Sequence, residues 1–363
     1  MSKAAELAAL IGGTSGSSLS NRNLIINGAM QVAQRGTSFT NTIEAYGADR
    51  INAYATNMGT FDVSQSTDAP DGFAKSFKFV CNTADASPAS TDETVVQYKI
   101  EGQDLQQLGY GTSSAKTITV SFYVRSSETG DFGLWLYNED GARQAASSYS
   151  INTANTWERK ELTFAGDTSN GFNDDTGVGV YLRWYLGSGS AFIGSLSSTW
   201  SSSTNRVPTG GVNIQGSANR NWYITGIQLE VGEQATPFEH RSFGDELARC
   251  QRYFCKSYEY DIAPGASASL DNLAGCAAVS GGTTATNRPF WFAGSFPVKM
   301  RTAPTITLYH YDGTSGKITG SSFASYNGTV ANVGEKGFNV YRSSGSTTAD
   351  QDHYCIFAAT AEL

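Results

Sequence analysis

Charged side chains are scarce in this 363-residue chain, where Asp, Glu, Lys and Arg make up 16% of the residues, against roughly 25% in typical soluble domains. The 33 acidic residues outnumber the 25 basic ones, so the formal net charge is −8. No cluster of Lys or Arg supplies the basic face that binding to phosphates requires. We therefore expect no nucleic-acid partner, and we expect hydroxyl and amide groups to provide most of the surface polarity.

Long apolar runs are also missing, since none approaches the roughly 18 residues of a membrane span. The opening MSKAAELAALIGG is too short for a signal peptide and carries Glu6 within its apolar part. The sequence thus predicts a chain made and folded in a cytoplasm, without membrane insertion.

Cysteines and histidines are few, and their spacing forms no known motif. An odd number of cysteines at scattered positions argues against a disulfide framework and against a zinc site. The five are Cys81, Cys250, Cys255, Cys276 and Cys355. We expect them to be buried as small apolar residues.

Signals of catalysis are weak. His240, His310 and His353 lack a nucleophile in a recognisable setting such as GxSxG. Three acidic pairs remain, but neighbours on a strand point to opposite faces and those in loops usually lie in solvent. These pairs are Asp92-Glu93, Glu139-Asp140 and Asp174-Asp175. We predict that the chain is not an enzyme and binds no cofactor. A structural calcium is compatible with the loop carboxylates, but no DxDxDG-like loop identifies its ligands.

Period-two alternation dominates residues 23–241 and predicts half-buried strands. It is clearest at 118–124, 134–137 and 180–185, where apolar residues alternate with polar or aromatic ones. Glycine- and serine-rich stretches such as 187–203 predict loops. We therefore expect an all-β fold whose first domain, residues 23–241, is a jelly-roll-type β-sandwich.

A strand, a turn and a helix follow one another between Asn221 and Phe254. Gly226 interrupts the strand as a bulge would, and Pro237 bars its continuation. Ser242 can cap a short helix, in which Leu247, Cys250 and Phe254 fall on one face. We assign 242–258 to this connecting helix.

Strand signals return in residues 259–363, at 290–298, 305–311, 338–341 and 354–359, with a turn at Asp312-Gly313. They predict a second, smaller β-domain. At the other end, residues 1–22 predict a short anchor helix and a linker. Ten residues cannot hold a helix alone in water, so its apolar residues Leu7, Leu10 and Ile11 need a partner surface.

Two distant motifs resemble a module of tailed-bacteriophage virion proteins. The first is NLIINGAMQVAQRGT at 23–37 with Ala48-Asp49-Arg50; the second comprises QLEVG at 228–232, ATPFEHR at 235–241 and CQRYF at 250–254. In that family the two motifs bracket a carbohydrate-binding-module-like β-sandwich carried on tail fibres and related surface proteins. The resemblance covers roughly residues 23–258 and implies a threefold assembly. One departure is Ile51, where the family usually has Trp.

The candidate site comprises the aromatic and arginine residues on the non-core side of the alternating strands. Aromatic rings stack on the C–H-rich faces of sugars, and Arg can donate two hydrogen bonds to vicinal hydroxyls or to a carboxylate. The candidate glycan-binding residues are Tyr123, Arg125, Trp135, Tyr137, Tyr181, Arg183 and Tyr185. They share one surface if their strands belong to one sheet. A subunit contact would have the same composition.

Taken with the resemblance, these features predict a non-enzymatic phage virion structural protein. We expect a homotrimeric tail fibre that docks onto another virion protein through its N-terminus and attaches to a host-surface polysaccharide. One alternative is a capsid-decorating or tail-joining protein that binds no receptor. Another is a polysaccharide-degrading tailspike.

Overall fold

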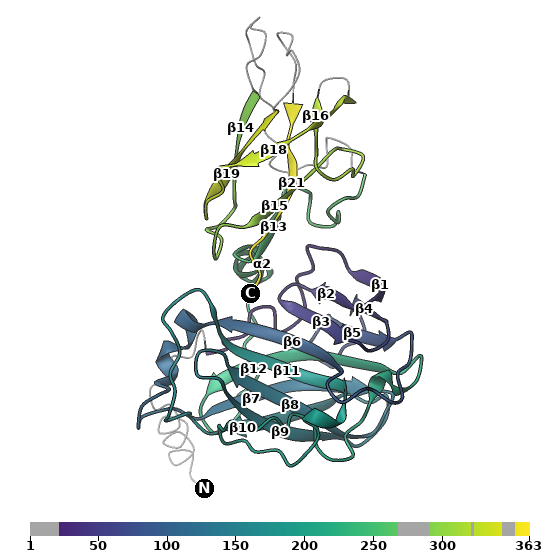
Figure 1. Ribbon diagram of the computed structural model, residues 1–363, viewed down its shortest axis with the longest axis vertical. Coiled ribbons are helices and arrows are strands. Elements are labelled where there is room, and N and C mark those ends of the chain that lie inside the picture. The colour runs from purple at the N-terminus through teal and green to yellow at the C-terminus, as the bar shows by residue number, and fades with distance from the viewer. Residues whose placement is uncertain (1–21, 268–289, 321–322, 343–352) are drawn as a thin grey trace, which may run out of the picture.

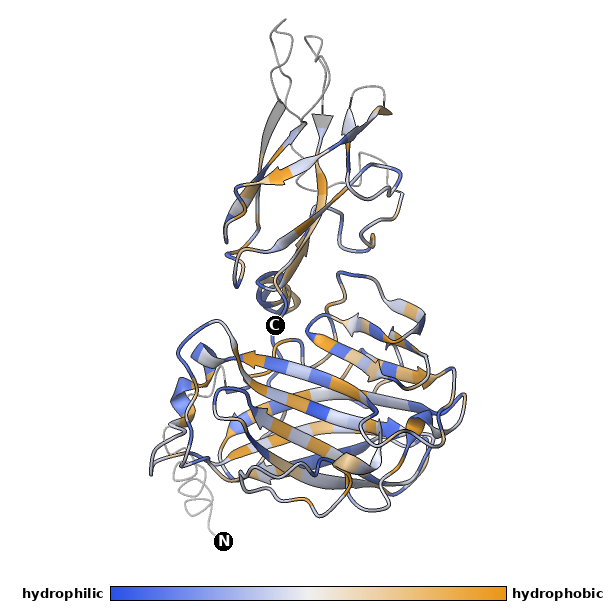
Figure 2. Cartoon of the chain, viewed as in Figure 1, coloured by the Kyte–Doolittle hydropathy of each residue, from blue (hydrophilic) through white to orange (hydrophobic). Residues whose placement is uncertain are grey.

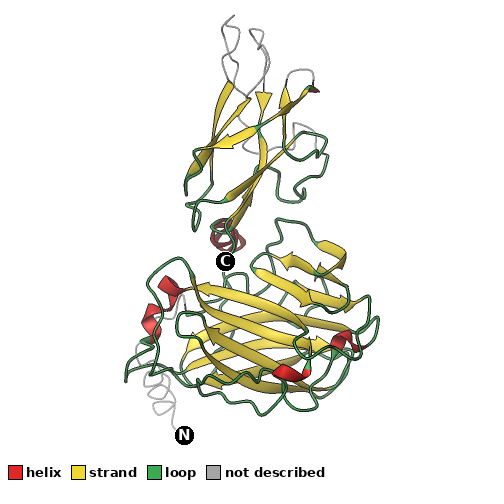
Figure 3. Ribbon diagram, in the orientation of Figure 1, coloured by secondary structure: helices red, strands yellow, loops and turns green. Residues whose placement is uncertain are grey.

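The computed structural model describes residues 22–267, 290–320, 323–342 and 353–363. The predicted anchor helix with Leu7, Leu10 and Ile11 lies outside these residues, and so does Cys276. Strands dominate the described chain, which confirms the all-β prediction (Figure 3).

The larger part of the molecule is a sandwich of two six-stranded antiparallel sheets (Figure 1). Sheet A contains, in spatial order, β1 (Ser38–Thr42), β4 (Phe61–Ser66), β5 (Ser76–Cys81), β12 (Asn221–Val231), β7 (Ile118–Ser126) and β10 (Glu158–Phe164). Sheet B contains β2 (Glu44–Ala48), β3 (Ile51–Thr56), β6 (Glu93–Glu101), β11 (Val178–Ser188), β8 (Gly130–Asn138) and β9 (Arg143–Ile151).

The chain passes back and forth between the two sheets, as in a jelly roll. From β5 onward it enters sheet B at β6, sheet A at β7, sheet B at β8 and β9, sheet A at β10, sheet B at β11 and sheet A at β12. Short 3-10 helices lie between strands at η1 (Gly102–Leu108), η2 (Ser190–Phe192) and η3 (Ile214–Gly216). From β5 to β12, consecutive strands therefore lie in opposite layers, except for β8 and β9.

The sandwich core lies between the sheets and follows the predicted alternation. Val120 and Phe122 from sheet A meet Leu134 and Leu182 from sheet B in one buried cluster. Figure 2 shows the alternation as hydrophobic and hydrophilic bands along the strands. The predicted phase of β7, β8 and β11 is thus confirmed.

The bulge in β12 is also confirmed. Its pairing with β7 shifts register between Thr225 and Gln228, and Gly226 has a φ of 62°. An added Cβ there would lie 2.7 Å from the Phe73 ring. Glycine is therefore required both by the backbone conformation and by the ring packed against it.

Helix α2 (Phe243–Gln251) joins the sandwich to the smaller unit. The Ser242 hydroxyl accepts a hydrogen bond from the Asp245 amide at 3.2 Å, which confirms the predicted cap. Phe254 is not on the helix, contrary to expectation. It begins β13 (Phe254–Lys256), because its backbone pairs with Thr360 in the smaller unit.

The smaller unit is built from three-stranded sheets around its own core. The first sheet contains β13, β21 (Ile356–Thr360) and β15 (Thr305–Tyr309); the second contains β14 (Phe290–Ser295), β19 (Gly337–Arg342) and β18 (Thr329–Ala331); the third contains β17 (Ser325–Asn327), β16 (Lys317–Gly320) and β20 (His353–Tyr354). The turn at Asp312-Gly313 is present, with Gly313 at a φ of 92°. The four described cysteines are buried, as predicted.

Candidate functional site

The seven predicted site residues do not share one surface. Strand β7 belongs to sheet A, whereas β8 and β11 belong to sheet B. Tyr123 and Arg125 therefore lie on the outer face of sheet A, where Tyr123 packs on Phe73 and Arg125 pairs with Asp68. The other five lie on the outer face of sheet B. The single seven-residue surface is thus corrected to one sheet face with five of its members.

Strand register places these five residues in cross-strand rows. Arg183 lies between Gln97 and Trp135, and Tyr181 lies between Lys99 and Tyr137. Neighbours in such a row are about 5 Å apart, so their side chains contact one another. Antiparallel pairing therefore gathers aromatic and cationic groups from β6, β11 and β8 on one face.

Half of this face is sealed. Trp135 and Tyr185 are only 3% and 1% exposed and form a small second core with Val207. The covering segment, residues 189–207, bridges back to β9 through Gln144. The indole of Trp135 donates to the Gln144 side-chain oxygen at 2.7 Å. Trp135 and Tyr185 are therefore packing residues and cannot contact a ligand in this conformation.

Glu93 organises the boundary of the sealed half. Its carboxylate accepts hydrogen bonds from the hydroxyls of Tyr54 and Tyr185, each at 2.9 Å. Arg183 and Arg206 approach the same carboxylate at 3.4 and 3.2 Å. Burial is the main cause that raises the pKa of both Tyr54 and Tyr185, so both hydroxyls stay protonated and donate.

Asp92, the sequence neighbour of Glu93, has a separate role. Its carboxylate accepts from the Ala89 amide at 2.8 Å and stabilises the turn before β6. The two carboxylates therefore do not work as a pair, and Glu93 acts through the groups that it holds in place.

The exposed half of the face, which we call the open face, consists of Tyr54, Lys99, Tyr137, Tyr181 and Arg183. All five side chains are partly exposed. The Arg183 guanidinium lies over the Tyr54 ring at 5.3 Å and over the Tyr181 ring at 5.0 Å. Tyr137 lies 6.2 Å from Tyr181 and stacks on Trp135 at 5.0 Å. Tyr137 and Tyr181 thus form a strip of two partly exposed rings beside a fixed guanidinium.

Sequence reasoning missed Tyr54 and Lys99. A weak alternation signal was present in both strands. Tyr54 directly follows the core residue Ala53, and Lys99 lies between the core residues Tyr98 and Ile100, so both side chains point away from the core. Their strands lacked the regular pattern of β7 or β11. Their place beside Tyr181 and Arg183 follows only from the pairing of β3 with β6 and of β6 with β11.

One end of the open face borders the joint between the sandwich and the smaller unit. Lys99 donates from Nζ to the carbonyl of Leu363, and Arg50 donates to the Lys99 carbonyl at 2.6 Å. Burial, and then the charge of Arg183, lowers the pKa of Lys99. The C-terminal residues thus limit the open face on this side.

The joint itself contains residues of both family-like motifs. Arg50 pairs with Glu362 and lies 3.5 Å from the centre of the Tyr253 ring. Glu101, which is fully buried, accepts two hydrogen bonds from Arg252 at 2.9 and 2.7 Å. The motifs therefore hold the two units together. Ile51, the departure from the family, is a fully buried core residue.

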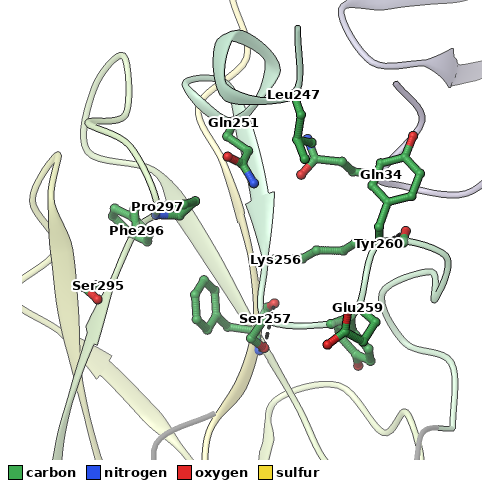
Figure 4. Close-up of a pocket in the computed structure, with 12 residues that line it drawn as sticks. Gln34, Leu247, Gln251, Lys256, Ser257, Glu259, Tyr260, Ser295, Phe296 and Pro297 are labelled. Atoms are coloured by element: carbon green, nitrogen blue, oxygen red, sulfur yellow. Dashed lines mark hydrogen bonds between the residues drawn. The ribbon is translucent and has the colours of Figure 1, made fainter. Parts of the chain in front are cut away.

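A cleft of about 380 Å³ lies beside the joint, between α2 and the smaller unit (Figure 4). Leu247 and Gln251 from the helix face Phe296 and Pro297 across it, with Lys256 between. The Lys256 ammonium donates to two backbone carbonyls at 2.7 Å each, and burial lowers its pKa to about 8. Lys256 thus ties the loop after β13 in place, and this cleft is separate from the open face.

Within the described ranges, no group of three or more His, Cys, Asp or Glu residues is arranged to hold a metal ion. Among the helices of that same part of the chain, none is long and apolar enough to cross a membrane.

No protein family matches the sequence, and no curated protein matches it. Among solved structures, the enzymatically active domain of tailspike protein 4 from bacteriophage CBA120 is 11% identical, with a TM-score of 0.34 over 58% of this chain and 22% of that chain. The CBM22-1 xylan-binding domain of Paenibacillus barcinonensis Xyn10C is 11% identical, with a TM-score of 0.26 over 56% of this chain and all of that domain. The C-terminal family 22 carbohydrate-binding module of Clostridium thermocellum Xyn10B is 14% identical, with a TM-score of 0.30 over 56% of this chain and 99% of that module.

The chain therefore spans about a fifth of the tailspike domain. At these identities and TM-scores the likenesses carry no argument about function, and the sandwich is defined by the strand pairing described above.

Proposed function

We propose that this chain is a phage virion protein that binds a cell-surface saccharide through the open face. The observation that carries the proposal is the pair of partly exposed rings, Tyr137 and Tyr181, held beside Arg183 on one sheet face. The two motifs at 23–50 and 228–254 support the virion assignment, because they resemble those of tail-fibre modules.

The open face offers two complementary kinds of contact. Tyr137 and Tyr181 present apolar ring faces on which the C–H groups of a pyranose can stack. Arg183 presents a planar donor fork beside them, suited to vicinal hydroxyls or a carboxylate. Because Gln97 and Glu93 both bind the guanidinium, at 3.2 and 3.4 Å, the fork is pre-oriented before the ligand arrives.

Binding without cleavage is part of the proposal. Each Glu93 oxygen already accepts a tyrosine hydroxyl, and the carboxylate faces two arginines. Glycoside hydrolysis needs two carboxyl groups flanking the scissile bond. None of the five open-face residues carries a carboxyl group, so the open face does not contain such a pair. Reducing-end release from a bound polysaccharide would instead favour a degrading tailspike.

A glycan array tests the binding proposal. Wild-type protein should bind a subset of surface saccharides, and the double variant Tyr137→Ala/Tyr181→Ala should lose that binding while it remains folded. The control is Tyr123→Ala, which removes a partly exposed tyrosine from the outer face of the other sheet. Equal loss in the control, or none in the double variant, would refute the assignment to this face.

A subunit contact is the second candidate for the same strip, because Tyr, Trp and Arg are enriched at protein interfaces. We propose a homotrimer, as in the fibre proteins that the motifs resemble. Light scattering should then give about three times the 38.7 kDa chain mass. A stable monomer would contradict the trimer. If the Tyr137→Ala/Tyr181→Ala substitutions dissociate the trimer, the open face is the trimer interface.

A further inference from the structure

We infer that the open face selects saccharides carrying carboxylate or sulfate groups over neutral saccharides of the same backbone. The inference rests on the proposed function and concerns the charge of the ligand. It comes from an excess of positive charge beside the two accessible rings, in a chain whose net charge is negative.

Glu93 is surrounded by more positive charge than it can balance. Arg183 and Arg206 both reach this one carboxylate, and Arg206 also donates to the Tyr185 hydroxyl at 3.0 Å. One negative charge therefore faces two guanidinium groups. All three residues are largely shielded, with side-chain exposures of 11 to 21%. One positive charge is left over in a partly desolvated position, where it is less screened by salt than a surface charge.

Arg183 and Lys99 have more hydrogen-bond donors than their protein partners use. A guanidinium group carries five N–H donors, and Arg183 uses Nε for Gln97 at 3.2 Å and Nη1 for Glu93 at 3.4 Å. Lys99 uses one of its three Nζ hydrogens for the Leu363 carbonyl. Both groups therefore keep hydrogens for a ligand, and hydrogen bonds to an anion are about twice as strong as neutral ones.

Both donors lie near the ring of Tyr181. The Arg183 guanidinium lies 5.0 Å from the Tyr181 ring centre, and the Lys99 nitrogen lies 5.4 Å from it. A sugar ring stacked on Tyr181 would thus lie close to two cationic donors. An acidic substituent on that sugar would meet at least one of them.

Acidic groups also border the face, and they set a limit on selectivity. Glu44, on β2, binds Asn52 at 3.4 Å, and Glu139 follows β8 near Tyr181. Both are exposed, so water and salt screen them more than they screen Arg183. Glu362 is already paired with Arg35 and Arg50. The charge of Glu139 acts on the Tyr181 hydroxyl more strongly than the charge of Arg183 does. The two cations are instead placed at the ring itself, since the Arg183 guanidinium and the Lys99 nitrogen lie 5.0 and 5.4 Å from its centre.

The test compares polysaccharides that differ only in charge. Alginate, polygalacturonate and hyaluronan are each immobilised beside their carboxyl-reduced forms, with xylan and dextran as neutral surfaces. We expect wild-type protein to bind at least one acidic form roughly tenfold or more tightly than its reduced form, and to lose this preference as salt rises. Lys99→Gln, which leaves Glu93 and its arginines intact, should reduce binding to the acidic form more than to the reduced form.

The outcomes separate the two proposals. Equal or tighter binding to the reduced or neutral forms, abolished by Tyr181→Ala, would overturn the charge selectivity and leave the saccharide-binding proposal standing. Binding to none of these surfaces and to no saccharide on the array would overturn both. An acidic preference that Lys99→Gln and Arg183→Lys leave unchanged would place the selectivity elsewhere and overturn this inference.

Discussion

Replacing Trp135 with alanine should destabilise the sandwich by about 3–5 kcal/mol, the usual cost of removing a buried tryptophan. Its side chain is 3% exposed, stacks on Tyr137 and donates to Gln144. Trp135→Phe keeps an aromatic ring but leaves the Gln144 oxygen without its donor. That variant should cost about 1–3 kcal/mol.

The assay is equilibrium denaturation in urea, followed by far-UV circular dichroism. The matched control is Trp157→Ala, because Trp157 is partly exposed on the outer face of sheet A and donates to the exposed Asp68 at 3.0 Å. We expect a loss of about 1 kcal/mol or less there. If Trp135→Ala costs no more than this control, segment 189–207 does not seal Trp135. The residue would then belong to the binding surface, and the division into sealed and open halves would be wrong.

Two further predictions concern the joint and the response to pH. Arg252→Met should lower the free energy of unfolding by roughly 2–3 kcal/mol, because it removes two hydrogen bonds to the buried Glu101 carboxylate. Thermal unfolding measures this loss, and an unchanged midpoint would show that the pair contributes nothing. Burial raises the pKa of Tyr98 to about 12 and also raises the pKa of Tyr149 and Tyr253 above the usual 10. Since the pKa of these tyrosines is higher in the folded state, their contribution to stability is complete below about pH 10 and is lost as the pH rises above it. Lys256, with its pKa lowered to about 8, has the opposite effect, so that its contribution to stability grows between pH 8 and 10.5. The tyrosines outnumber it, so urea midpoints should fall above pH 10; a midpoint that is constant to pH 12 would contradict their burial.

Local patterns predicted much of the fold. The phase of β7, β8 and β11, the bulge at Gly226 and the cap at Ser242 all depend on residues close together in the sequence. The assignment of strands to sheets does not, and for this reason Tyr123 was grouped with Tyr181 although the two lie in opposite layers. Phe254 fits the helical spacing as well, but its backbone pairs with Thr360, a partner that periodicity cannot reveal.

The candidate site was predictable only in part for the same reason. Alternation correctly placed Trp135 and Tyr185 outside the sandwich core. It could not show that segment 189–207 folds back over them, because a glycine- and serine-rich stretch carries no periodic signal. Tyr54 and Lys99 enter the open face through the pairing of β3 and β6, which is a long-range property of the fold.

The central claim is that the open face binds a saccharide. It is tested most directly by the dissociation constant of Tyr181→Ala, measured by isothermal titration calorimetry with a saccharide that binds the wild type. Loss of one stacking ring should weaken binding by about 1–3 kcal/mol, by analogy with aromatic stacking on other flat ligands, while the urea midpoint stays near the wild-type value and Tyr123→Ala binds normally. Wild-type affinity in a folded Tyr181→Ala variant would contradict the claim.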